Sequence, residues 1–457
     1  MNIVTPASPA SPATLRKVTA AAAIGNFVEW FDFAVYGFLA TIIAQNFFSQ
    51  ALPQTALLQT FLVFAVAFAL RPLGGVIFGM LGDKYGRKRI LSLTVLMMAG
   101  ATTLIGLLPT DRHLGIMAPI LLTLARCIQG FSAGGEYAGA CAYVMEHSPP
   151  RKRAWYGSFI TVSTFSAFAA AAVITFLSDA ALGQDQMRAW GWRIPFLIAA
   201  PLGLVGIYLR IRMEETPAFR AARREEAGTH AALADTLRQQ TGNILRLGAF
   251  IALTALTFYM FTTYFSTFLQ LQGHFSRASA LLVSFLALLF AAGLCPVAGA
   301  LCDGIGRRKT VAVTGGWVIV SVLPAWWLAS SGLLWAAILG DMLLATGAVF
   351  SGVVTAALLS EVFPTRARYT ASAITYNLAY TLFGGTAPLV ATWLIDYTGN
   401  TLSPAFYLVA VAVLALAGGL SLPETSRISL QDDAAHPHSR QQGAVKHVGT
   451  VARKEPV

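Results

Sequence analysis

Two carboxylates, Glu29 and Asp32, lie in the apolar stretch GNFVEWFDFAVYGF, residues 25–38. An ionisable side chain inside a lipid-soluble segment costs several kcal/mol unless it finds a partner or water, so its presence indicates function. At about 1.5 Å per residue from Lys17, Asp32 should lie about 22 Å along a helix and Glu29 about 18 Å. We predict Asp32 as the proton carrier, with Glu29 sharing the proton or hydrogen-bonding within the bundle. The alternative is a static buried ion pair.

The basic counterpart of these acids is Arg126, which lies 13 residues past His113 in another apolar segment, about 20 Å from its outer end. The two segments run in opposite directions, so their charges can meet near the middle of the membrane. The guanidinium of Arg126 stays charged and offers a planar fork that matches a carboxylate bidentately, which lysine lacks. We predict that a substrate carboxylate competes with Asp32 for Arg126. Asp32 then holds a proton more readily. This competition would couple the movement of the substrate to the movement of the proton.

Polar tips on neighbouring apolar segments complete the predicted substrate site. Tyr and Trp side chains also gather at membrane surfaces, so interface anchoring is the alternative for each aromatic residue. We expect Arg71, which precedes Pro72, to act as a gate on the cytoplasmic side, and we assign no role to Glu136. The predicted substrate-binding residues are Arg126, Gln129, Tyr36, Tyr259, Tyr264, Tyr376 and Asn377.

The rest of the chain has the composition of a polytopic membrane protein. Of its 457 residues, 56% are hydrophobic and only 12% are charged, far from the usual mix of soluble proteins. About 20 apolar residues are needed to cross the hydrocarbon core of a bilayer as a helix. The predicted fold class is an all-α membrane protein with twelve transmembrane helices, which begin near residues 18, 57, 90, 114, 154, 191, 244, 278, 310, 333, 370 and 403.

Basic residues mark alternate connections between these segments. They cluster before the first segment and after the second, fourth, sixth, eighth and tenth, whereas the intervening connections carry almost none. By the positive-inside rule, both termini and the connection at 213–243 are cytoplasmic, and we expect a multi-pass protein of the inner (plasma) membrane. The net charge of +11 therefore reflects topology, and no nucleic-acid partner is expected.

Two repeated motifs divide the chain. GMLGDKYGRKR at 79–89 aligns with GALCDGIGRRK at 299–309, and EHSPPRKR at 146–153 aligns with EVFPTRAR at 361–368. Because both matches occur at nearly the same offset, we predict two parallel six-helix halves, 18–212 and 244–424, joined by a linker at 213–243. Residues 1–17 are a predicted disordered cytoplasmic tail, and 425–457 a second tail. Parallel repeats are a transporter architecture in which substrate binds between the halves.

The repeated motifs also predict a latch on the cytoplasmic face, formed by ion pairs that close in one conformation and break in another. Glycines in the motif allow helices to approach closely and the chain to turn tightly. The alternative is that the charges only set topology. The predicted latch residues are Gly79, Asp83, Gly86, Arg87, Glu146, Arg151, Asp303, Arg307, Glu361 and Arg366.

The loop motif G-x-L-x-D-x-x-G-R-[KR]-[KR] resembles the signature of the major facilitator superfamily, and the resemblance covers residues 18–425. GNFVEWFDFAVYGF, RPLGGVIFG, RCIQGFSAGGEYAGA, WGWRIPF and EETPAF look like its metabolite:proton symporter branch. That resemblance implies proton-driven uptake of an organic acid such as α-ketoglutarate, citrate or shikimate, or of proline or betaine. The placing of Asp32 and Arg126 also resembles an acid–arginine pair in proton-coupled sugar porters.

We therefore predict a symporter that imports a small organic acid, a di- or tricarboxylate, together with protons by alternating access. The alternative substrate is a zwitterionic osmolyte, proline or betaine. Against it, the tail after residue 425 has no sustained apolar heptads, whereas the resemblance associates a coiled-coil extension with osmosensing members. An embedded enzyme or a channel would be a different class, but no H-E-x-x-H, G-x-S-x-G or nucleotide-binding motif occurs. We expect no enzymatic activity, no cofactor or metal, and a monomer in the lipid bilayer.

Overall fold

The computed structural model describes residues 12–85, 87–134, 136–212, 233–428 and 430. Within these ranges the secondary structure is helical, without strands. Nine helices in the described part are long and apolar enough to cross a membrane, and Ser92–Leu107 and Arg193–Tyr208 are shorter apolar helices. The architecture agrees with the predicted twelve-helix membrane fold.

The N-terminal half supplies six crossing positions, several of which are built from two consecutive helices. α1 continues into α2, α3 into α4, and α7 is followed by α8. The bounds are α1 Pro12–Phe38, α2 Ala40–Phe47, α3 Pro53–Ala69, α4 Arg71–Tyr85, α5 Arg87–Leu107, α6 Asp111–Leu114, α7 Met117–Ser132, α8 Glu136–His147, α9 Arg153–Gln186 and α10 Arg193–Arg212.

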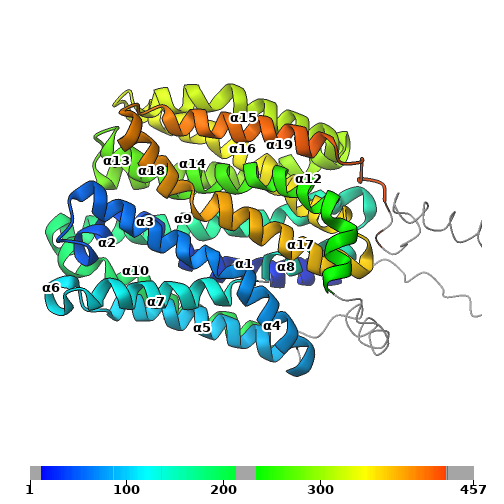
Figure 1. Cartoon of the computed structure of the whole chain (residues 1–457), viewed down its shortest axis with the longest axis horizontal. Coiled ribbons are helices and arrows are strands. Elements are labelled where there is room, and N and C mark those ends of the chain that lie inside the picture. The colour runs from blue at the N-terminus through cyan, green and yellow to red at the C-terminus, as the bar shows by residue number, and fades with distance from the viewer. Residues whose placement is uncertain (1–11, 86, 135, 213–232, 429, 431–457) are drawn as a thin grey trace, which may run out of the picture.

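The C-terminal half supplies the other six positions and lies beside the first half, above it in Figure 1. Two of its crossings contain a wider π-helical turn, at Met260–Tyr264 and at Tyr380–Gly385. The bounds are α12 Leu233–Tyr259, α13 Phe265–Leu271, α14 Arg277–Ile305, α15 Arg307–Ala329, α16 Leu334–Glu361, α17 Thr365–Ala379, α18 Ala387–Thr398 and α19 Ser403–Leu420.

Two helix starts differ from the prediction. α1 begins at Pro12, inside the stretch predicted as a disordered tail, and α12 begins at Leu233, inside the predicted linker. Hydropathy detects only the part of a helix that suits lipid, whereas the helical hydrogen-bond pattern continues through polar helix formers. The sequence pattern therefore could not locate the start of a helix that extends beyond its apolar stretch.

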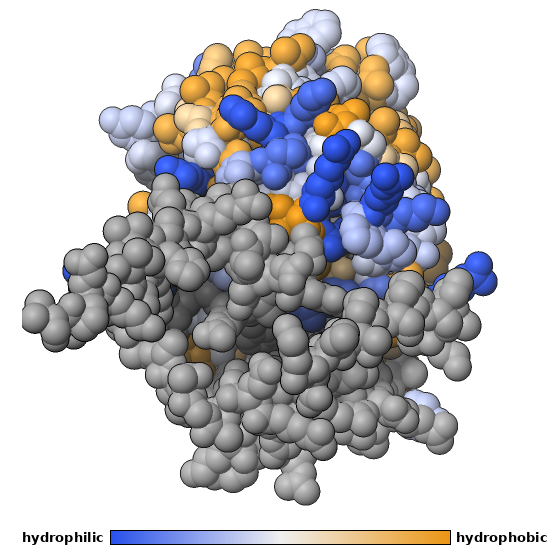
Figure 2. Space-filling view, turned by 90° about the vertical axis from the view of Figure 1, so that its right-hand side faces the viewer, coloured by the Kyte–Doolittle hydropathy of each residue, from blue (hydrophilic) through white to orange (hydrophobic). Residues whose placement is uncertain are grey.

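The connections that carry basic motifs meet at one end of the bundle, which we call the basic end. There the Arg153 guanidinium donates to the carbonyl oxygen of Ile428, and the Arg368 guanidinium donates to that of Leu430. Figure 2 views this end, where hydrophilic residues gather above the grey segments. Connections at the opposite end contact one another, for example through the Asn46 amide, which donates to the carbonyl oxygen of Arg188. The fold thus places the connections with clustered basic residues at one end of the bundle and the connections with almost none at the other, as the sequence predicted.

Glycines allow α7 to lie directly against α3 and α4. A Cβ atom at Gly130 of α7 would overlap the carbonyl oxygen of Ala67, and one at Gly134, just after α7, would overlap that of Arg71. Small residues of this kind let membrane helices approach backbone to backbone. The contact brings the α7 residue Arg126 and the α4 residue Arg71 toward the same interior, where the candidate site lies.

Candidate functional site

Arg126 is fully buried in the interior of the bundle. Its Nη1 donates to Oε1 of Gln129 at 2.7 Å, and the Gln129 amide donates in turn to the hydroxyl of Thr102. Among the described residues, Nε and Nη2 of Arg126 have no hydrogen-bond partner. These two atoms form one edge of the guanidinium, with parallel donors that suit the two oxygens of a carboxylate.

Aromatic rings surround the Arg126 guanidinium. Its Cζ lies 4.2 Å from the ring centroid of Tyr36, 5.1 Å from that of Phe64 and 5.4 Å from that of Phe33. The Tyr36 hydroxyl donates to the carbonyl oxygen of Thr60 at 3.0 Å, which fixes the ring. Cation–π contacts stabilise a buried cation without neutralising it. The guanidinium is therefore held in place and still lacks a carboxylate at its free edge.

Asp32 lies in the same region and is only 2% exposed. Its carboxylate interacts with the Thr102 side chain and, electrostatically, with Arg126. In the described part of the chain, Oδ2 of Asp32 has no hydrogen-bond partner, and no ion pair with Arg126 forms within 4.0 Å. The structure thus brings the charges of the first and fourth crossings together, but the link runs through Gln129 and Thr102.

The direct ion pair of this interior joins Glu29 to Arg71. Nη2 of Arg71 lies 3.7 Å from Oε1 of Glu29, and both side chains are buried. The Arg71 Cζ lies 4.5 Å from the ring centroids of both Phe33 and Phe68 and 5.6 Å from that of Trp30. Arg71, expected to act as a gate on the cytoplasmic side, therefore lies in the interior, in what we call the central cluster: Glu29, Arg71 and the rings of Trp30, Phe33, Phe64 and Phe68. The signal available in the sequence was a second arginine within an apolar span.

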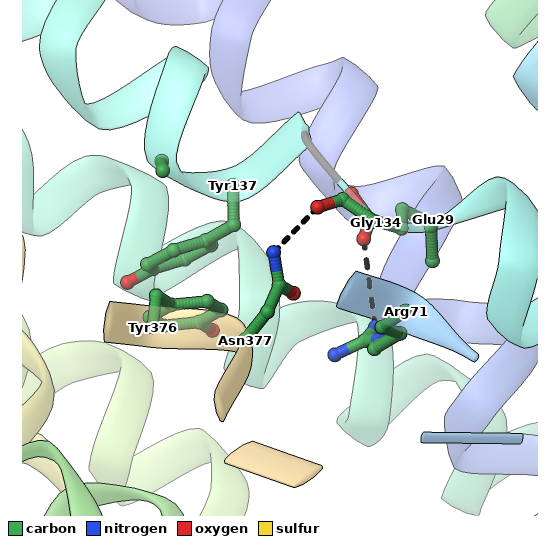
Figure 3. Close-up of a pocket in the computed structure, with 8 residues that line it drawn as sticks. Glu29, Arg71, Gly134, Tyr137, Tyr376 and Asn377 are labelled. Carbon is green, nitrogen blue, oxygen red and sulfur yellow. Dashed lines mark hydrogen bonds and ion pairs between the residues drawn. The ribbon is translucent and has the colours of Figure 1, made fainter. Parts of the chain in front are cut away.

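A small pocket lies beside this ion pair and between the two halves (Figure 3). Tyr137 of α8 stacks on Tyr376 of α17 with ring centroids 4.7 Å apart, and the Asn377 amide donates to the carbonyl oxygen of Gly134. Both contacts join one half to the other. Of the predicted site residues, Glu29, Tyr376 and Asn377 line this pocket together with Arg71.

The two predicted tyrosines of the seventh crossing lie at different levels. Tyr259 contacts the rings of Phe64 and Phe68, and its hydroxyl has no hydrogen-bond partner among the described residues. Tyr264 contacts Phe61 of the other half, at a ring-centroid distance of 6.4 Å. Tyr259 therefore packs against the central cluster, whereas Tyr264 lies further toward the opposite end.

Part of the predicted latch is present at the basic end. Arg307 forms a bidentate pair with Glu361, from Nε to Oε2 at 3.0 Å and from Nη2 to Oε1 at 2.9 Å. Asp303 accepts from Nη1 of Arg307 at 2.9 Å. It also accepts from the backbone N–H groups of Ala154 and Trp155, which begin α9 of the other half. Asp303 thus joins the halves as a cap on α9.

The repeated E-x-x-P-x-R-x-R motif makes reciprocal ion pairs between the halves. Arg153 lies 3.8 Å from Glu361, and its repeat counterpart Arg368 lies 3.0 Å from Glu146. The sequence prediction chose the first arginine of this motif, Arg151, but its side chain is exposed. The repeat itself pointed equally to the last arginine. The predictions on Gly79, Asp83, Gly86, Arg87 and Arg366 fall on positions whose side chains lie outside the described residues.

We expect Glu361→Gln to open the basic end far more than Glu146→Gln, although the two residues are repeat counterparts. Glu361 is fully buried and faces two arginines, whereas the Glu146 side chain is 32% exposed. Removing one partner of a buried pair costs about 3 kcal/mol, and an exposed pair contributes about 1 kcal/mol or less. In a background without the native cysteines, a maleimide reagent should label Ala138→Cys in the pocket about 100-fold faster with Glu361→Gln. Equal labelling rates in the two variants would contradict this latch.

Comparison with known proteins agrees with this geometry. Residues 22–385 match the Major Facilitator Superfamily. The chain is 39% identical to the glycine betaine/proline/ectoine/pipecolic acid transporter OusA of Dickeya dadantii, over 91% of this chain and 85% of that protein. It is also 39% identical to the proline/betaine transporter of Escherichia coli strain K12, over 96% and 90% of the two chains.

A solved structure supports the fold independently. The proton:xylose symporter XylE superposes with a TM-score of 0.72 over 93% of this chain and 99% of that chain, at 16% identity. This likeness concerns the fold alone. Together with the family match and the relatives, it means that the chain belongs to the Major Facilitator Superfamily, in the branch of proton symporters that includes proline/betaine permeases.

Proposed function

We propose that the protein imports a small zwitterion of the proline or betaine class together with a proton. The observation that carries this proposal is the free Nε–Nη2 edge of Arg126, buried in the interior. It offers one bidentate site, which suits one carboxylate. The neighbouring guanidinium of Arg71, which is also buried, already has Glu29 as its carboxylate partner.

The charges of the interior favour a substrate without net charge. Two arginines, Arg71 and Arg126, accompany two acids, Glu29 and Asp32, so the four charges sum to zero when both acids are ionised. A dicarboxylate would add two negative charges and would have to displace Glu29 or bind protons. A zwitterion adds none, and desolvated charge is the main cost at such a site.

The names of the relatives support the same class, since several are proline/betaine transporters. The organic-acid reading gains no such support and gives way to its alternative. One clue against the osmolyte was the absence of apolar heptads after residue 425, and the other was an arginine, not a lysine, at position 126. A missing heptad pattern in the tail sequence says little about which solute the charges between the halves would bind.

Proton coupling is assigned to Asp32 through its electrostatic interaction with Arg126. When the substrate carboxylate binds the free edge of Arg126, the positive charge is shared and Asp32 more readily takes a proton. Protonation and substrate binding then favour each other, because linked binding equilibria act reciprocally. The charges of the interior are satisfied when both substrate and proton are bound. In that state the transporter changes the side of the membrane to which its site is open.

Access is proposed to alternate by motion of one half against the other, with the basic end facing the cytoplasm of a bacterial inner membrane. The contacts that close this end are the Asp303 cap, the reciprocal arginine pairs and the Tyr137–Tyr376 stack. Between Arg277 and Asp179 an ion pair of 3.3 Å joins the halves toward the opposite end. The structure therefore corresponds to an enclosed state.

Uptake into vesicles tests this function. We expect purified protein in proteoliposomes to accumulate labelled proline and glycine betaine when the outside is acidic, with saturation and with mutual competition. An excess of α-ketoglutarate or citrate should not compete. If the dicarboxylates are accumulated and the zwitterions are not, the substrate class is wrong. If accumulation ignores the pH gradient, the coupling is wrong.

A further inference from the structure

Trp30 is the residue at which aromatic rings of the two halves converge. It belongs to α1 and is 1% exposed. Its ring centroid lies 5.1 Å from that of Phe258 and 6.4 Å from those of both Tyr259 and Tyr380, all in the C-terminal half. It lies 6.2 Å from Tyr137 of its own half. Since substrates of this architecture bind between the halves, this cluster lies where a solute must pass.

The Trp30 ring is held by its edge. Its Nε1 donates to Oδ1 of Asn26 at 3.0 Å. The Asn26 amide donates to Oγ1 of Thr164 at 2.7 Å and to Oγ of Ser163 at 2.9 Å. All hydrogen bonding of the indole is therefore satisfied at its rim. Its faces pack against aromatic rings of both halves, and the faces that contact the C-terminal half become accessible only when the halves part. A fixed ring loses little entropy when it binds a partner.

The carboxylate site and the Trp30 ring lie on either side of Phe33. The Phe33 ring centroid is 5.4 Å from the Cζ of Arg126 and 6.3 Å from the centroid of Trp30, and these two distances put the site and the ring at most about 12 Å apart. The Trp30 face is already an environment for cations, because the Arg71 guanidinium lies 5.6 Å from its centroid. The same quadrupole attracts a second positive group, and the Glu29 carboxylate beside Arg71 offsets the repulsion between the two cations.

A quaternary ammonium group has no N–H and cannot donate a hydrogen bond, so it is recognised by aromatic faces. Trp30 moves with the N-terminal half, whereas Tyr259 and Tyr380 move with the C-terminal half. When the halves part, these faces separate, and a methylated ammonium group fits between them. The Tyr259 hydroxyl, which lacks a hydrogen-bond partner in the described part of the chain, can accept from the N–H of a secondary ammonium instead.

We propose that Trp30, Tyr259 and Tyr380 form the ammonium subsite of the transporter, with Asn26 as a positioning residue that holds the Trp30 ring. This assignment rests on the proposed zwitterion transport and adds to it the group that sets substrate preference. Solutes with a methylated ammonium group are favoured by the ring faces over solutes of the same shape without the charge.

The test compares glycine betaine with tert-butylacetate, which keeps the carboxylate and the shape but has a neutral carbon in place of the nitrogen. Affinities are measured by calorimetry on the full-length protein in nanodiscs. We expect the wild type to bind glycine betaine about 10-fold more tightly than tert-butylacetate, the range of a desolvated cation–π contact. Trp30→Phe should reduce this ratio, and Trp30→Leu should reduce it further; the part that remains reflects the net charge of tert-butylacetate. Asn26→Ala should lower the ratio while the affinity for tert-butylacetate is kept.

Trp326→Leu is the matched control. Trp326 is also fully buried among rings, at 5.7 Å from the centroids of both Phe265 and Phe268, but these lie within its own half. Its replacement should leave the ratio unchanged. A wild-type ratio near one, or a ratio that Trp30→Phe leaves intact, overturns the subsite while zwitterion transport stands. If the wild type binds neither glycine betaine nor proline, zwitterion transport itself fails. The wild-type and Trp30→Phe measurements decide the matter even if Trp30→Leu does not fold.

Discussion

Replacement of Asp32 by asparagine is expected to abolish substrate accumulation driven by a pH gradient while exchange of substrate across the membrane continues. Asp32 is buried beside Arg126, and its Oδ2 lacks a hydrogen-bond partner among the described residues. Asparagine keeps the size and hydrogen-bonding capacity of the side chain but cannot change its charge. The substrate site should therefore remain, and only its link to the proton should be lost.

The expected effect is large because the gradient is the only source of accumulation in proteoliposomes. Each pH unit is worth about 1.4 kcal/mol per proton, and a gradient of about two units supports about 100-fold accumulation of a zwitterion that moves with one proton. Asp32→Asn should reach only the external concentration. Its exchange of labelled for unlabelled proline should stay within about threefold of the wild type.

Asp341→Asn is the matched control for this experiment. Asp341 is another fully buried aspartate, in α16 of the other half, and neither of its oxygens has a hydrogen-bond partner in the described part of the chain. We expect that variant to accumulate substrate normally. Normal gradient-driven accumulation by Asp32→Asn would refute the assignment. If Glu29→Gln alone shows the uncoupled behaviour, Glu29 carries the proton instead.

The fold could be predicted because the bilayer imposes it. An apolar stretch long enough to span lipid has to be helical, since its backbone polar groups find no other partners there. The repeated motifs added the two-half organisation, and the reciprocal pairs of Glu146 with Arg368 and Glu361 with Arg153 are its direct consequence in the structure. Helix starts such as Pro12 and Leu233 were not predictable, because they lie in polar sequence where lipid imposes nothing.

Individual site residues were predictable where a charge stood in an apolar segment, as at Asp32 and Arg126. Their partners were not. The pairing of Glu29 with Arg71 depends on how α4 is placed, and that placement follows from the backbone contact at Gly134. Thr102, which links Gln129 to the region of Asp32, is an ordinary hydroxyl in an apolar helix. Such contacts depend on the rotation of each helix, which the spacing within one helix does not determine.

The second large effect is expected at Arg126. Arg126→Lys should weaken the binding of proline and glycine betaine about 10- to 100-fold, which corresponds to the loss of about 1.5–3 kcal/mol for a hydrogen bond to a charged group. The lysine ammonium keeps the charge but not the planar fork, and it cannot present two parallel donors to one carboxylate. Binding is measured by calorimetry at fixed pH on the purified protein.

The variant Arg71→Lys tests which of the two guanidiniums, that of Arg71 or that of Arg126, binds the substrate carboxylate. Because lysine keeps the positive charge that pairs with Glu29, we expect the substrate affinity to fall by about threefold or less. If the effects are reversed, so that Arg71→Lys loses affinity and Arg126→Lys does not, the carboxylate binds beside Glu29. The pocket lined by Glu29 and Arg71 would then be the substrate site, and the competition that couples substrate to proton would act on Glu29 instead of Asp32.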